Sequence, residues 1–262
     1  MTSVLHDPGR PAGLSPTTRL IDGASALVTA CGCDCAARSV TILRGFDADS
    51  RHRSKAVRDR LRRRGITARV TAAPVAATRD QLHGVHVASR GVPHVCVFVD
   101  ATAGGRQEAD RIAGWFGIPV VGLGQSAETQ THPLLRLGLH DTRPGDRRVF
   151  PSTAGEVVGV AFDFVAVLPN QPEKGSLRVR VGRDLPRDLP EGSAVRMAML
   201  SGHVQVTTAE GAGQSRTWIA DQVRVEQTSG VHTIHRDGLL VADLDGCLSV
   251  IPDPRGLVRH SV

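Results

Sequence analysis

Aromatic residues are scarce in this sequence: they make up 3% of the chain, and tyrosine is absent. Proteins that bind single-stranded nucleic acid stack its bases on aromatic side chains, so this scarcity argues against that function. No apolar run approaches the roughly 20 residues that a membrane-spanning helix needs. The opening "MTSVLHDPGRPAGLSP" also lacks the basic and then apolar pattern of a secretory signal. We therefore expect a cytoplasmic protein with a flexible leader over residues 1–37.

Cysteine is also sparse, with five residues, an odd number, and no secretory signal, which argues against a disulfide framework. The net charge is +6, the isoelectric point is near 9.7, and the basic residues are almost all arginine. An excess of Ala, Arg, Val and Gly over Lys is typical of a GC-rich bacterial or phage coding sequence. Part of the arginine excess is therefore attributed to codon usage.

The remaining sequence has two parts that differ in the pattern of their hydrophobic residues. Residues 38–124 alternate strand-like runs such as "HVCVFVDA" with helix-like runs such as "GRQEADRIAGWFG", which predicts right-handed crossovers and a parallel sheet. From about residue 155, short runs such as "SLRVRVG" and "DQVRVEQ" have a period of two and are separated by turn signals. We predict an α/β N-terminal domain with a parallel sheet over residues 38–150, followed by an antiparallel β-sandwich domain over residues 151–262.

The segment "VCVFVDATAGGRQEAD" reads as a strand, a glycine turn and a helix that starts near Gly105. Backbone N–H groups at such a turn attract anions together with the positive end of the helix dipole, and ligands gather where parallel strands end. Asp100 could carry Mg²⁺, and Thr102 could donate to a phosphate oxygen. The alternative is that Gly104 and Gly105 only permit a tight turn, since neither a P-loop nor GxGxxG is present.

Three further patterns have the residue types of a metal site. On a strand, the cysteines of "CGCDC" would share one face and could hold Zn²⁺ or Cu(I), but their spacing is not CxxC. The histidines of "HGVH" would face one way on a helix, whereas those of "HTIH" would face opposite ways on a strand. Buried or incidental side chains are the favoured interpretation for all of them: Cys31, Cys33, Cys35, His83, His86, His232 and His235.

Residues 51–64, "RHRSKAVRDRLRRR", hold eight basic side chains and one Asp. As a helix, this segment would turn Val57 and Leu61 inward and surround its outer face with arginine. That face could dock on an anionic membrane or on nucleic acid. A solvated surface enlarged by codon usage is the favoured alternative.

Asp237-Gly238 lies between two strand-like runs in "HRDGLLVADLDG" and is a strong signal for a β-hairpin turn. Asp243 and Asp245, followed by Gly246, are consistent with a second turn. Three carboxylates within nine residues could also supply a base or a metal ligand. Ordinary turn residues are the favoured interpretation of this segment when it is taken alone.

Together these segments resemble the diacylglycerol kinase and sphingosine kinase superfamily of lipid kinases, which is similar in fold to NAD kinases. The resemblance rests on "VCVFVDATAGGRQEADRIAGWFGIPVVGLG" and on the closing stretch from "RTWIADQVRV" to "IPDPRGLV". It implies an ATP- and Mg²⁺-dependent phosphoryl transfer to a lipid hydroxyl, with Asp237 as general base and Asp100 as the Mg²⁺ ligand. The nucleotide-binding positions implied by the resemblance are Asp100, Thr102, Gly104, Gly105, Glu108, Gly124, Ser126 and Thr129.

The sequence departs from the family pattern in three places. The Gly-Gly-Asp-Gly-Thr turn is replaced by Val-Asp-Ala-Thr-Ala-Gly-Gly, Leu239 stands where the closing Asp-Gly-Glu turn has Glu, and the second loop lacks Gly-Thr-x-Asn. Phosphoryl transfer depends mainly on positioning and charge neutralisation, so these losses could abolish it while the fold remains. A catalytically inactive nucleotide- or lipid-binding relative is therefore the main alternative to an active lipid kinase. An NAD kinase-like enzyme and an unrelated two-domain protein are the further alternatives. The basic segment 51–64 also predicts peripheral contact with a membrane.

Overall fold

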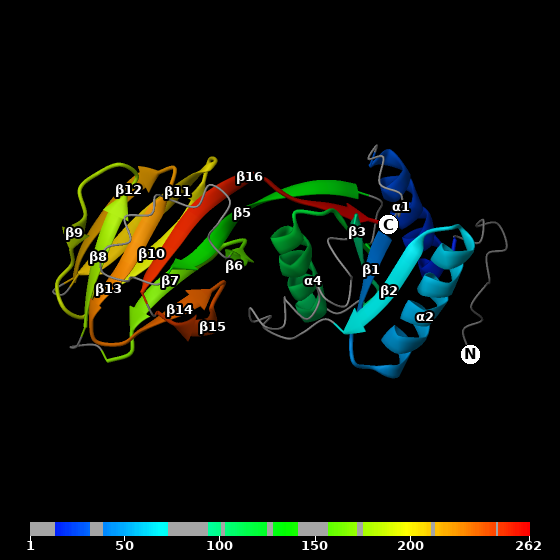
Figure 1. Cartoon of the computed structure of the whole chain (residues 1–262), viewed down its shortest axis with the longest axis horizontal. Helices are drawn as coiled ribbons and strands as arrows, with labels where there is room; N and C mark the ends of the chain where they lie inside the picture. Colours follow the sequence, from blue (N-terminus) through cyan, green and yellow to red (C-terminus); the bar gives the residue numbers. More distant parts are fainter. Residues whose placement is uncertain are drawn as a thin grey trace, which may run out of the picture.

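The computed structural model describes residues 14–31, 39–72, 94–100, 103–124, 128–140, 157–171, 175–210, 213–244 and 246–262. These residues form one mixed sheet of ten strands and a separate antiparallel sheet of six, and strands predominate over helices (Figure 1). The coarse expectation of parallel strands followed by antiparallel strands is therefore confirmed. The predicted "HGVH" helix, Cys33, Cys35, Thr102, Ser126 and Asp245 lie outside the described residues.

Four parallel strands begin the mixed sheet, in the order β2-β1-β3-β4. Their bounds are β1 Ser39–Arg44, β2 Thr67–Ala72, β3 Val95–Phe98 and β4 Val120–Gly122. Along β3, Val95 and Val97 face one hydrophobic cluster while Cys96 and Phe98 face another, so both faces of the strand are buried. This burial explains why β3 reads as a continuous apolar run, because a parallel sheet is covered on both faces.

Helices cover the two faces of these parallel strands. Helices α1 (Pro16–Ala30) and α2 (Ala48–Arg63) pack on one face, and α4 (Ala103–Phe116) packs on the other (Figure 1). The predicted orientation of α2 is confirmed, since Val57 and Leu61 are fully buried. Asp47 caps its first turn by accepting a hydrogen bond from the Ser50 N–H at 2.6 Å.

Helix α1 corrects the prediction of a flexible leader over residues 1–37, which is wrong for residues 16–30. Ser15 is the N-cap, Pro16 occupies the first helical position, and four side chains face the core. The early Pro and Gly residues suggested disorder, but Pro at the first position of a helix favours its start. The buried positions follow helical spacing: Leu20, Ile21, Ala24 and Val28.

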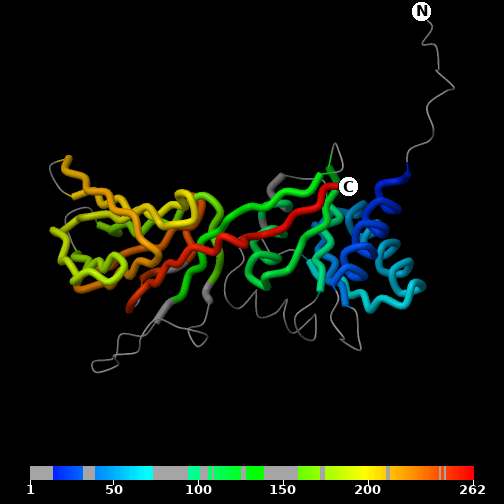
Figure 2. Tube along the Cα trace, turned by 90° about the horizontal axis from the view of Figure 1, so that it is seen from above, coloured from blue at the N-terminus to red at the C-terminus, as the bar shows by residue number. Residues whose placement is uncertain are grey.

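The longest strands, β5 (Glu128–His140) and β16 (Cys247–Ser261), join the parallel strands to the rest of the molecule. They pair antiparallel along most of their length and run side by side in both views (Figures 1 and 2). The last residues of β16 also pair parallel with β4, whereas its first residues pair antiparallel with β13 (Val223–Ser229). The chain consequently does not divide simply at residue 150, because its final strand returns to the parallel strands.

The second sheet lies against the far part of the first. Its order is β12-β11-β10-β7-β14-β15, with every neighbouring pair antiparallel. Side chains from both sheets, such as Val225 and Val167, form one buried cluster between them. The remaining bounds are β6 Val157–Ala161, β7 Phe164–Pro169, β8 Ser176–Val181, β9 Arg187–Asp188, β10 Ala194–Leu200, β11 His203–Glu210, β12 Gln214–Ala220, β14 His232–Arg236 and β15 Leu239–Asp243.

The hairpin prediction at Asp237-Gly238 is confirmed. These two residues connect β14 to β15, and both have positive φ values, 50° and 83°. A two-residue turn with two positive φ angles follows the twist of antiparallel strands, and Asp and Gly are among the residues that tolerate it. Of the helices in the described ranges, none combines the length and apolar character needed to cross a lipid bilayer.

His232 is a buried polar residue on β14. Its side chain is fully buried, and neither ring nitrogen has a hydrogen-bond partner among the described residues. Burial lowers the pKa of His232 from its ordinary value near 6.5. His235 is half-buried on the opposite face of the strand, as the period of two predicts. Burial therefore favours the neutral form of the His232 imidazole in the folded protein.

We expect the thermal stability to fall as the pH drops below about 6.5, because the unfolded chain then binds a proton that folded His232 resists. Replacing His232 with Leu should reduce the difference in melting temperature between about pH 7.5 and about pH 5.5 by a few degrees. His52→Asn is the control, since it removes an exposed imidazole. Equal pH dependence in the His232→Leu protein and the wild type would contradict this assignment.

Candidate functional site

The carboxyl ends of β1 and β3 bring a group of polar residues together. Asp100 follows β3, and its carboxylate lies against Gly45, the residue after β1, so closely that a side chain at position 45 would collide with it. Arg53 of α2 reaches the same edge and donates to the Val99 carbonyl oxygen at 2.6 Å. Asp100 therefore lies at the carboxyl ends of the parallel strands, the edge at which ligands of open parallel sheets commonly bind.

Helix α4 begins at Ala103, about two residues earlier than the sequence suggested. Gly104 and Gly105 are consequently in its first turn and not in a loop before it. Arg106, also in this turn, donates to the Leu123 carbonyl oxygen at 2.7 Å and so ties α4 to the end of β4. The start of α4 and the residues just after β4 therefore meet at one edge of the sheet.

The predicted residues farther along the chain lie in regular structure. Gly124 follows β4 and donates its N–H to the Val262 carbonyl oxygen at 3.1 Å. Thr129 belongs to β5, where its hydroxyl contacts His260 Nδ1 at 2.9 Å, so it is not part of a loop. Glu108 is in the second turn of α4, and its side chain lies outside the described part of the structure.

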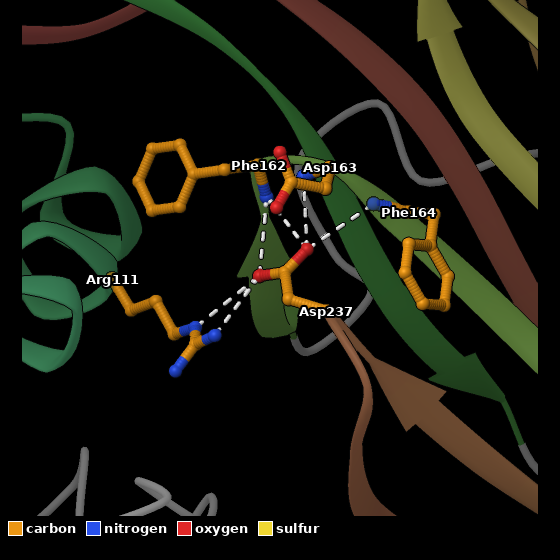
Figure 3. A network of polar contacts seen from close by, with 5 residues as sticks. All are labelled: Arg111, Phe162, Asp163, Phe164 and Asp237. Atoms are coloured by element: carbon orange, nitrogen blue, oxygen red, sulfur yellow. Dashed lines mark hydrogen bonds and ion pairs between the residues drawn. The ribbon is translucent and has the colours of Figure 1, made fainter. Parts of the chain in front are cut away.

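Asp237 is the centre of a buried polar network. Its Oδ2 accepts hydrogen bonds from Arg111 Nη2 at 3.1 Å and Nε at 3.3 Å, and both side chains are essentially inaccessible to solvent. Its Oδ1 accepts the backbone N–H groups of residues 162, 163 and 164 at 2.9 to 3.2 Å. Figure 3 shows Arg111 reaching from α4 to one oxygen while the tight turn between β6 and β7 surrounds the other.

This environment corrects the role predicted for Asp237. A general base must come within hydrogen-bond reach of the proton that it removes, and this carboxylate is 0% exposed with both oxygens occupied. A carboxylate that is ion-paired and bonded to several N–H groups stabilises the fold instead. Asp237 therefore joins α4, the β6–β7 turn and the β14–β15 turn.

A cavity of about 460 Å³ lies beside α4 and the β6–β7 turn. Arg111 is eight residues beyond Ala103, which places it about 12 Å along α4 at 1.5 Å per residue. The cavity lies beside α4 between Arg106 and Asp110, and the β6–β7 turn that Asp237 holds forms part of its wall. Four segments line it: Arg106, Gln107 and Asp110 of α4, His132 and Pro133 of β5, Phe162 and Asp163 of the β6–β7 turn, and Arg259 of β16.

The walls of the cavity carry charges of both signs. Arg259 pairs with Asp110, which is 4% exposed, and burial together with the nearby charge of Arg106 lowers the pKa of Arg259. Asp163 is exposed, and its backbone N–H donates to Asp237 at 2.9 Å. The Nε2 atom of His132 is buried without a hydrogen-bond partner in the described structure. The cavity thus presents two guanidinium groups, an imidazole and an exposed carboxylate.

The residues that line this cavity form no pattern that predicts a shared site from the sequence. They come from four segments between positions 106 and 259 that no local motif connects. The described residues contain no group of three or more Asp, Glu, His or Cys side chains that could hold a metal ion. Cys31 caps the end of α1, whereas Cys96 and Cys247 are buried in strands, where burial raises the pKa of both thiols.

Comparison with known proteins does not assign the chain to a family. No family model matches it, and no curated protein does. Among solved structures, sheep galectin-11 in complex with glycerol aligns with 52% of this chain and 92% of its own, with 10% identity and a TM-score of 0.11. A similarity at this level carries no argument about fold or function.

The Asp237 network predicts a large loss of stability in Asp237→Asn. Asn tolerates the positive φ at this position, so the substitution mainly removes the negative charge that faces the buried Arg111 guanidinium. We expect the free energy of unfolding in urea to fall by about 3 kcal/mol.

Asp188→Asn is the matched control, because it breaks an exposed ion pair with Arg178 and should leave the unfolding midpoint almost unchanged. A loss of stability in Asp237→Asn no larger than in the control would show that the buried pair does not hold α4.

Proposed function

We propose that this protein binds a phosphate-bearing small molecule of the nucleotide class in the cavity between α4, β5, β16 and the β6–β7 turn. The observation that carries the proposal is a cavity of about 460 Å³ with two arginines in its wall. Its volume is in the range of small-molecule sites, and its polar groups converge from four segments.

The lining residues suit the two halves of a nucleotide. Arg106 and Arg259 carry planar guanidinium groups, whose geometry matches phosphate oxygens. Arg259 already pairs with Asp110, but the neighbouring charge of Arg106 still repels it, and an anion bound between the two guanidinium groups would reduce that repulsion. Phe162 and Pro133 offer apolar surface for a flat base. ATP is the first ligand to test, and NAD is the second.

Of the two possibilities, a binding protein and a kinase with Asp237 as general base, we favour the binding protein. Its carboxylate is enclosed by Arg111 and three backbone N–H groups, so it has no free oxygen for an acceptor hydroxyl. The proposed architecture keeps an α/β unit and a β-sandwich unit, with β16 returning to the first. Mg²⁺ would accompany the phosphates, and Asp100, which directly precedes the predicted glycine turn in the sequence, is its candidate carboxylate ligand.

A phosphotransferase is the second candidate, and one observation favours it. Asp163 lines the cavity, is exposed, and has its backbone held by Asp237. A carboxylate placed in this way could accept the proton of an acceptor hydroxyl, whether the acceptor is a lipid or NAD. In that case the base is Asp163, and Asp237 positions it.

Thermal unfolding with millimolar Mg²⁺-ATP tests the binding proposal. A ligand at 100 times its dissociation constant stabilises the folded state by about 2.7 kcal/mol, which corresponds to a rise of several degrees. Arg106→Gln should lose most of this rise, whereas Arg183→Gln, which changes an exposed arginine far along the chain, should keep it. The proposal fails if neither ATP nor NAD shifts the midpoint, or if Arg106→Gln retains the full shift.

Transfer of labelled phosphate from ATP to diacylglycerol, sphingosine or NAD separates the two candidates. A binding protein should transfer none above background. If transfer occurs, Asp163→Asn should abolish it and leave the ATP-induced stabilisation unchanged, as expected for a base that does not hold the nucleotide. Transfer that survives in Asp163→Asn would remove Asp163 as the base.

A further inference from the structure

The outward face of α2 carries a line of cations that the proposed function does not use. Its inward positions, which include Val57 and Leu61, are buried against the parallel strands. Beside these buried positions, one flank of α2 carries basic residues at the spacing i, i+4, i+7 and i+11, which places them in one row along the helix. This basic stripe consists of Arg51, Lys55, Arg58 and Arg62.

Acidic residues in the described part of the chain leave the charge of the basic stripe largely uncompensated. Asp59 pairs with Arg58, but Arg51 and Arg62 donate to the carbonyl oxygens of Phe46 and Ala68, which carry no net charge. Lys55 is exposed and has no acidic partner among the residues that the structure describes. The adjoining residues Arg60, Arg63 and Arg64 add three further exposed guanidinium groups, and within the described ranges only Arg64 pairs with an acid, Asp22.

Large apolar side chains are exposed at the amino-terminal end of the same helix layer. Phe46 is 63% exposed, precedes α2 by two residues, and its carbonyl oxygen accepts a hydrogen bond from Arg51 at 3.0 Å. Leu14 is also 63% exposed and directly precedes Ser15, which lines a small cavity together with His52 of α2. An aromatic side chain beside a row of arginines is unfavourable in water alone but suits the boundary between lipid headgroups and acyl chains.

We propose that the basic stripe and Phe46 form a docking surface for an anionic lipid bilayer. The cations would contact lipid phosphates and carboxylates while Phe46 enters the interface, with α2 parallel to the membrane plane. Nucleic acid would satisfy the cations but would leave Phe46 and Leu14 exposed, so a bilayer accounts for more of the surface. The proposal is independent of the cavity, because none of its residues lines it.

Sedimentation with vesicles tests this surface. The protein should pellet with vesicles of equal parts phosphatidylserine and phosphatidylcholine, should remain in solution with phosphatidylcholine alone, and should dissociate as salt is raised. The triple variant Arg51→Gln, Lys55→Gln, Arg62→Gln should bind at least about tenfold more weakly. The control triple variant Arg180→Gln, Arg183→Gln, Arg187→Gln removes the same charge from exposed positions elsewhere and should bind like the wild type.

Phe46→Ser separates a bilayer from other polyanions. It keeps every cation of the stripe, and it should weaken vesicle binding severalfold without changing the unfolding midpoint. If Phe46→Ser leaves vesicle binding intact and a short RNA duplex displaces the vesicles from the stripe, the surface binds nucleic acid and the membrane proposal is overturned. Equal vesicle binding by the two triple variants would also overturn it.

Discussion

The buried ion pair between Arg111 and Asp237 is the interaction on which the arrangement of the candidate site depends. It joins residues 126 positions apart in the sequence, one on a helix over the parallel strands and the other in a hairpin turn of the second sheet. Isolated burial of either charge would be strongly unfavourable, so the two groups and the three N–H donors of the β6–β7 turn form together or not at all. The cavity beside α4 keeps its shape because this network fixes the wall that contains Phe162 and Asp163.

Backbone pairing makes the second connection. Strands β5 and β16 pair with each other, and Arg136 of β5 donates to Asp253 of β16 at 2.7 Å near the point where their register shifts. Gly256, at a φ of 57°, lies so close to the His132 carbonyl group that only a residue without a side chain fits. The position of His132 in the cavity wall thus depends on a glycine in the neighbouring strand.

Local signals predicted the elements, and long-range contacts decided the site. The sequence predicted α2, the parallel strands and the Asp237-Gly238 hairpin, because each depends on the periodicity or turn chemistry of adjacent residues. The role of Asp237 was mistaken because its partners, Arg111 and the β6–β7 turn, lie far away in the chain. The cavity was missed for the same reason, since Arg106 and Arg259 meet only after β16 has returned to β4. Helix α1 was missed because a proline that favours its first turn was taken as a sign of disorder.

The return of β16 to β4 also has a consequence for the order of folding. Residues 120–122 pair with residues 259–261, so the last hydrogen bonds of the mixed sheet close a loop of more than half the chain. Contacts of such large sequence separation form late and slowly. Until they form, β4 is an open strand edge beside the buried strand β3. A nascent or refolding chain therefore exposes an unpaired strand edge, which can pair with other chains, until β16 has docked. The yield of folded protein should consequently depend more on molecular chaperones or on a low protein concentration than on the stability of the final fold.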